Sequence, residues 1–149
     1  MEATIIKLEK LLNIGQEYLS NSSDNHLCYK YSKEKWSKKE ILGHLVDSAI
    51  NNLQRFTEIQ FVNKPYKIRK YNQNELVIAN DYQNEETTEI IAFWLTINNR
   101  IKNLIKLQTE TTLIYKIELE HNNFSDLRFL IIDYVAHLEH HLNQIMKEN

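Results

Sequence analysis

The sequence predicts an all-α protein that folds as a four-helix bundle with a long connection between its second and third helices. Its 149 residues include only two glycines and one proline, fewer than the turns of an all-β chain of this length require. Four long segments repeat apolar side chains every three or four residues, the spacing that gives a helix one buried face. We expect a single domain, residues 1–149, because this length can bury a core.

The composition is that of an ordinary globular protein. Eighteen basic and 20 acidic residues leave a net charge of −2, which argues against a nucleic-acid partner. The single cysteine, Cys28, has no second cysteine in the chain with which to form a disulfide. No apolar run approaches the roughly 18 residues of a membrane span, and the first residues lack the pattern of a secretory signal. We therefore expect a cytoplasmic protein without a membrane partner.

The first two helices have clear boundaries. Apolar residues at helical spacing predict the first helix over 3–20, and the polar run 21–25 predicts a loop after it. Ser37 and Glu40 have the spacing of a capping box, which predicts the start of the second helix. The apolar stripe of that second helix consists of Ile41, Leu42, Leu45, Val46, Ala49, Leu53 and Phe56.

The opposite arc of the second helix carries polar side chains. His44, Asp47, Ser48, Asn51 and Arg55 gather there. His44 is thus expected to lie outside the core-facing stripe. Such an arc is most often a solvated face, but a histidine within it makes a polar cleft plausible.

The remainder of the chain contains two more helices and a long connection. Residues 59–83 are polar and predict an irregular connection with a short helix over 75–79. The third helix is expected over 85–107, where apolar residues form a packed seam. The weak alternation of 112–119 predicts an extended segment.

The last helix is expected to begin at Ser125 as N-cap, with Asp126 in its first turn, and to end near residue 147. Its apolar stripe consists of Leu127, Leu130, Ile131, Tyr134, Leu138, Leu142 and Ile145. His137 and His141 fall at the edge of this stripe, where they would face a crevice.

Three histidines are candidate metal ligands. His137 and His141 are four residues apart, so their imidazoles project from one face of the helix. With His44 from the second helix they could present three nitrogens to one divalent ion. Asp47 and Asp133, each about one helical turn from a histidine, are candidates to orient a ligand or a water molecule. Six histidines in a helical chain also produce such a pair by chance, so spacing alone leaves a plain surface pair open.

Other conspicuous residues have simpler interpretations. His26 and His121 are expected in surface loops, and His140 is expected to point to solvent from the last helix. Trp36 and Trp94 are expected to be core aromatic residues.

Three segments together resemble the DinB/YfiT-like superfamily. Residues 36–48, WSKKEILGHLVDS, followed by Arg55, are similar to its second helix. Residues 71–77, YNQNELV, are similar to its loop before the third helix, and residues 133–145, DYVAHLEHHLNQI, to its last helix. The three segments occur in the order found in the family and span most of the chain.

The resemblance implies a four-helix bundle that holds a divalent metal ion, most often nickel or zinc, on three histidines. These correspond here to His44, His137 and His141. Some members of the superfamily transfer low-molecular-weight thiols such as bacillithiol, mycothiol or glutathione, and many have no established activity.

Two classes of function remain open. The first is a metal-dependent enzyme that joins a small-molecule thiol to an electrophile, with Asp47, Asn51 and Arg55 orienting the thiol; the same site could instead activate water for hydrolysis. The second is a non-catalytic metal-binding or stress-associated protein. A homodimer is expected in either case. A ferritin-like di-iron site is disfavoured, because its Glu-x-x-His spacing occurs only at Glu118 and His121, in an expected loop.

Overall fold

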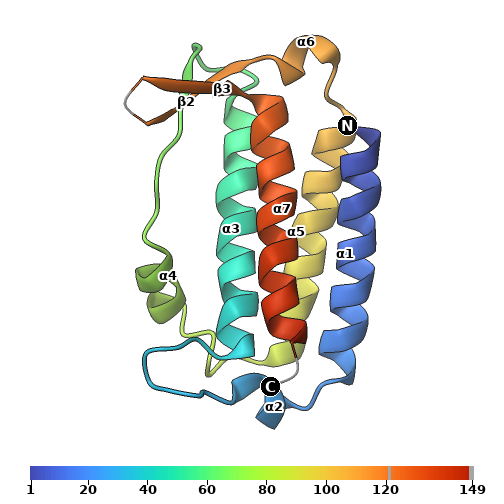
Figure 1. The fold of residues 1–149 in the computed structure, drawn as a ribbon, viewed down its shortest axis with the longest axis vertical. Helices are drawn as coiled ribbons and strands as arrows, with labels where there is room; N and C mark the ends of the chain where they lie inside the picture. Colours follow the sequence, from blue (N-terminus) through green and yellow to red (C-terminus); the bar gives the residue numbers. More distant parts are fainter. Residues whose placement is uncertain (121, 148–149) are drawn as a thin grey trace.

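Four long helices run side by side in the structure, a computed structural model that describes residues 1–120 and 122–147 (Figure 1). They are α1 (Glu2–Asn21), α3 (Lys38–Glu58), α5 (Thr87–Lys106) and α7 (Leu127–Met146). In Figure 1, α1 and α7 run in one direction and α3 and α5 in the other. The predicted four-helix bundle is therefore confirmed, and its second and third long helices are parallel. No helix in the described residues is long and apolar enough to span a membrane.

Shorter elements lie at the two ends of the bundle and along its side (Figure 1). The short helices are α2 (Asp24–Cys28), α4 (Gln73–Ala79) and α6 (Glu110–Leu113), and the strands are β1 (Tyr66–Lys67), β2 (Lys116–Glu120) and β3 (Asn123–Asp126). The strands form a small sheet in the order β1-β2-β3, with β1 parallel and β3 antiparallel to β2. This sheet lies at the end of the bundle where α7 begins (Figure 1).

The core lies between the four long helices. Leu8 of α1, Leu45 of α3, Trp94 of α5 and Leu138 of α7 are each at most 1% exposed. Their positions follow the three-and-four spacing of the sequence, because that spacing places one apolar stripe of each helix on the bundle axis. Trp94 is thus a core residue, as expected.

The outer face of α3 is also buried, which the sequence does not predict. The connection from residue 59 to residue 86 passes along α3 from one end of the bundle to the other, and α4 packs against α3 (Figure 1). Tyr82 of this connection lies so close to Gly43 that a Cβ there would meet its Cδ2 at 2.1 Å. His44 lies off the apolar stripe, as expected, yet it is fully buried rather than solvated. The rings of Trp36, His137 and His141 pack against it, with centroids 5.1, 5.1 and 4.6 Å from that of His44.

The structure confirms most helix boundaries to within two residues. The capping box of α3 is formed, with Glu40 N donating to Ser37 Oγ at 3.1 Å and Ser37 N donating to Glu40 Oε2 at 2.7 Å. The short helix expected over 75–79 is α4.

Three local expectations are wrong. The N-cap of α7 is Asp126, whose Oδ1 accepts from Phe129 N at 2.8 Å, because Ser125 is extended in β3 and pairs with Ile117. The expected loop 21–25 contains the start of α2, which Ser23 caps. The segment 112–119 is extended only from Lys116, since its first residues complete α6.

Candidate metal centre

The three candidate histidines converge between α3 and α7. One ring nitrogen of His44, one of His137 and one of His141 all lie within 4.8 Å of one another. The Nε2 atoms of His44 and His137 are 3.3 Å apart. Side-by-side packing of α3 and α7 brings His44 to the pair, and the four-residue spacing stacks the pair on one face of α7. The sequence and the packing thus place three imidazoles around one point.

Neighbouring side chains orient two of the rings. His141 Nδ1 lies 2.8 Å from Gln144 Oε1, which can only accept, so this Nδ1 carries the proton and Nε2 keeps its lone pair. His137 Nδ1 lies 3.4 Å from Ser48 Oγ. The Nδ1 of His44 is buried and has no partner among the described residues. Partners of this kind fix the rotation of histidine ligands in metal sites.

An aromatic ring packs against one of the three histidines. The indole of Trp36 lies against His44, with ring centroids 5.1 Å apart and the planes inclined by 34°. Trp36 is half-buried, so it is a wall of the site and not the core residue that the sequence predicted.

The donor set fits a divalent metal ion. Two nitrogens bound to one zinc ion at about 2.1 Å in a tetrahedral arrangement lie roughly 3.4 Å apart, close to the separation of the two Nε2 atoms. Three neutral imidazoles suit zinc, nickel, copper or iron, and they leave at least one coordination position for another ligand. His44, His137 and His141 could hold such an ion; its identity is not decided by this donor set.

Burial keeps the three histidines neutral. Desolvation, reinforced by the neighbouring histidines, lowers the pKa of His44 to about 3 and that of His137 to about 4. Desolvation also lowers the pKa of His141, although its contact with Gln144 opposes this shift. Neutral imidazole is the form that binds metal, so the folded protein holds its candidate ligands ready for coordination.

Metal affinity is expected to persist to a lower pH than it would if the three histidines had the pKa of free histidine. An ordinary pKa of about 6.5 would make affinity fall as soon as the pH passes below about 6.5. Since burial lowers all three pKa values, the neutral rings persist and the fall is expected about one unit or more lower. Zinc dissociation constants measured by chelator competition between about pH 7 and pH 4 test this. A loss of affinity centred near pH 6.5 would contradict it.

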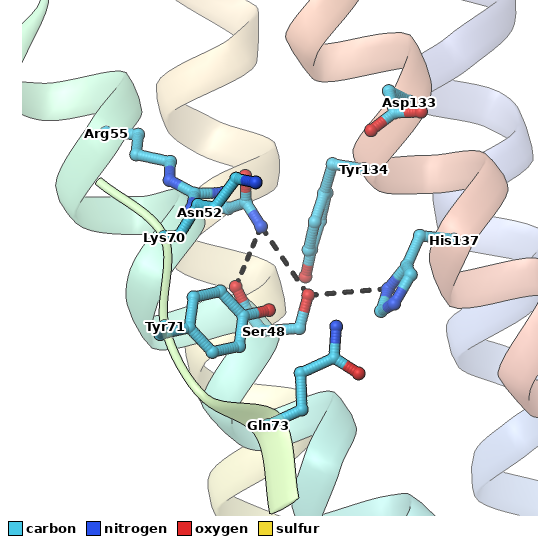
Figure 2. A pocket seen from close by; sticks show the side chains of 9 residues that line it. All are labelled: Ser48, Asn52, Arg55, Lys70, Tyr71, Gln73, Asp133, Tyr134 and His137. Atoms are coloured by element: carbon cyan, nitrogen blue, oxygen red, sulfur yellow. Dashed lines mark hydrogen bonds between the residues drawn. The ribbon is translucent and has the colours of Figure 1, made fainter. Parts of the chain in front are cut away.

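A pocket opens beside His137. It has a volume of about 320 Å³ and is lined by Ser48, Asn52, Arg55, Lys70, Tyr71, Gln73, Asp133, Tyr134 and His137. Figure 2 shows these side chains, which come from α3, α7 and the connection over α3. Asn52 Nδ2 donates to the backbone oxygen of Ser48 at 2.9 Å, and Ser48 in turn contacts His137. The pocket is therefore polar and reaches the histidine cluster at one end.

The residues predicted to bind substrate are separated by the structure. Arg55 lines the pocket, whereas Asn51 lines a smaller neighbouring hollow that Arg55 also borders. Asp47 lines neither: its Oδ1 accepts from Tyr82 at 2.7 Å and from Asn80 at 2.9 Å, so it ties the connection to α3. Asp133 lines the pocket, on the helix that carries two of the histidines.

The other histidines lie outside the cluster. His140 is exposed on α7, as expected, and its Nε2 accepts from Gln144 at 3.0 Å. His26 is exposed but lies on α2, where its Nε2 is 3.1 Å from Lys38 Nζ. The expectation for His121 falls outside the described residues.

Sequence reasoning missed several residues of the site. Ser48 and Asn52 follow His44 by four and eight residues, and Gln144 follows His141 by three. Helical spacing places all of them beside the histidines, so this signal was available. Tyr71 and Gln73 had no such signal, because only the path of the connection brings them to the pocket.

The comparisons with known proteins agree with this architecture. A family model for the DinB superfamily matches residues 8–145. The chain belongs to the DinB superfamily. No curated protein sequence matches this DinB-superfamily chain.

Solved structures share its fold at low sequence identity. YfiT from Bacillus subtilis, described as a probable metal-dependent hydrolase with an unusual four-helix bundle topology, superposes with a TM-score of 0.84 at 20% identity, over 97% of this chain and 82% of YfiT. The mycothiol-dependent maleylpyruvate isomerase superposes with a TM-score of 0.74 at 11% identity, over 97% of this chain. The DinB-superfamily chain covers only 60% of that isomerase.

Proposed function

We propose that this protein is a metal-dependent enzyme that transfers a low-molecular-weight thiol to a small electrophilic molecule. The observation that carries the proposal is the convergence of three neutral imidazoles, that of His44 buried and those of His137 and His141 half-buried, at the end of a polar pocket. A divalent metal held by His44, His137 and His141 would lower the pKa of a thiol or of water and so supply a nucleophile at neutral pH. The thiol sulfur then forms a bond to the electrophilic carbon, the thiol proton goes to solvent, and the leaving group departs with its electron pair.

The chain's own residues support such a reaction in three ways. Gln144 and Ser48 orient the rings of His141 and His137. Trp36 packs against His44, which is fully shielded from water. The pocket volume of about 320 Å³ suits a small molecule and not a macromolecule.

A metal-dependent hydrolase is the second candidate. It is favoured by the fold shared with YfiT, which is described as a probable metal-dependent hydrolase. The same three histidines would serve it, because a site that activates a thiol can also activate water. The two candidates differ in what is consumed, so one assay separates them.

The test measures both reactions with the same protein. Protein loaded with zinc or with nickel is mixed with 1-chloro-2,4-dinitrobenzene and, in turn, glutathione, bacillithiol or mycothiol, and thiol consumption is followed. Parallel samples receive p-nitrophenyl acetate without thiol. We expect thiol consumption that depends on the metal and that stops when a chelator removes it. Metal-dependent ester cleavage without thiol consumption would favour the hydrolase. The absence of both reactions would favour the non-catalytic alternative.

A further inference from the structure

Arg55 is a half-buried cation at the end of the pocket away from the histidines. Its Nη2 donates to the backbone oxygen of Arg69 at 2.7 Å, and its Nη1 lies 3.4 Å from Asn52 Oδ1. The ring of Tyr71 lies over the guanidinium, with Cζ 5.5 Å from the ring centroid. These contacts hold the guanidinium in place, and every one of them is with a neutral group.

No carboxylate neutralises this guanidinium within the described residues. The ion pairs found there do not include Arg55, and Lys70, at the rim of the same pocket, is already paired with Glu120. Asp133 lines the pocket beyond ion-pair distance from Arg55, and its negative charge offsets the effect of burial on the pKa of Arg55 only in small part. Burial lowers the pKa of Arg55, which reflects the cost of holding this charge out of water.

The contacts of the guanidinium with Arg69 and Asn52 leave some of its N–H donors available for a ligand. Arginine offers five N–H donors in a planar fork that matches a carboxylate, and the two contacts above use only part of them. A half-buried, oriented and unneutralised guanidinium is therefore suited to an anionic group of a ligand.

The pocket connects this guanidinium to the metal centre. The Arg55 side chain contacts Asn52, one turn earlier on α3, and Ser48, one turn earlier again, contacts His137. Seven residues of helix from Ser48 to Arg55 rise about 10 Å. In Figure 2, Asn52 lies between the two ends and Tyr71 lies at the side of the pocket. A short extended molecule can therefore place one end on Arg55 and the other at the histidines.

We propose that Arg55 binds the carboxylate of a small thiol whose sulfur reaches the histidine cluster. This inference rests on the proposed thiol transfer and narrows its thiol. Glutathione and bacillithiol carry carboxylates and would satisfy Arg55, whereas mycothiol carries none. Asn52 and Tyr71 act as positioning residues for the guanidinium.

The test compares two thiols that differ only in charge. Isothermal titration calorimetry measures the binding of 6-mercaptohexanoate and of 6-mercaptohexanol to the zinc-loaded protein. Because a charge-assisted hydrogen bond is formed only by the carboxylate, we expect the first to bind about tenfold more tightly or better. In Arg55→Gln this preference should vanish while the affinity for 6-mercaptohexanol stays the same. Equal affinities in the unaltered protein would overturn the proposal.

Two control variants separate a specific site from general electrostatics. Arg100→Gln removes the same charge from an exposed position on α5 and should leave the preference intact. Asp133→Asn removes a negative charge from the pocket. It should strengthen the binding of 6-mercaptohexanoate and leave the binding of 6-mercaptohexanol unchanged. An equal loss of preference in Arg55→Gln and Arg100→Gln would contradict a carboxylate site at Arg55.

A second measurement keeps this proposal distinct from thiol transfer. Hexanoate and hexanol are added to metal-free protein, and the Nε–H signal of Arg55 is followed by NMR. A shift with hexanoate only supports the carboxylate site, and no shift overturns it. If neither thiol binds the zinc-loaded protein, thiol transfer is contradicted and the hexanoate result still decides the role of Arg55.

Discussion

Replacing His141 with alanine is expected to lower zinc affinity by more than about 100-fold and to abolish any metal-dependent turnover. Losing even an outer partner of a metal ligand costs roughly 10–100-fold in affinity, and here one of three ligands is lost. The helices should remain intact, because His141 lies at the edge of the α7 stripe and alanine is the best helix former. Zinc titration measures the affinity, and circular dichroism of the metal-free variant measures the helices.

His140→Ala is the matched control for this substitution. His140 is the adjacent residue on α7, is exposed, and lies outside the cluster. Its replacement should leave zinc affinity and stoichiometry nearly unchanged. If His140→Ala and His141→Ala weaken zinc binding equally, the ion is held by a surface histidine cluster and not by His44, His137 and His141.

Replacing Gly43 with alanine is expected to destabilise the metal-free protein by about 2 kcal/mol or more. The added Cβ would lie 2.1 Å from Cδ2 and 2.2 Å from Cγ of Tyr82, so the ring must move as a whole. Overpacking typically costs about 1–3 kcal/mol and occasionally more, and so close an overlap puts this substitution at the upper end of that range, while alanine in place of glycine contributes about 1 kcal/mol of favourable helix propensity. Moving Tyr82 also breaks its hydrogen bond to Asp47. Urea denaturation measures the change.

The same substitution made in a Tyr82→Ala background gives the control. With the ring absent, the three atoms nearest to the new Cβ are gone, and the gain in helix propensity is expected to dominate. Gly43→Ala should then be neutral or slightly stabilising, so its effect reverses sign between the two backgrounds. An equal destabilisation in both would mean that the cost arises elsewhere than at Tyr82.

The sequence by itself determined the four long helices and the pairing of His137 and His141 on one helix face. Local chemistry decides these features: apolar spacing defines α1, α3, α5 and α7, the Ser37–Glu40 box starts α3, and the spacing of His137 and His141 places both on one face. His44 was the third candidate from its place on the polar arc, and the family resemblance pointed to it as well. The packing of α3 on α7 brings its Nε2 to 3.3 Å from that of His137.

Only the tertiary structure decided which polar residues face the pocket. Helical spacing places Asp47, Asn51 and Arg55 on one arc of α3. In the structure, Asp47 accepts a hydrogen bond from Tyr82 of the connection over α3, whereas Arg55 lines the pocket. The same segment adds Tyr71 and Gln73 to the pocket. Its path depends on contacts between residues distant in sequence, such as Tyr82 against Gly43, and such contacts leave no periodic signal in the chain.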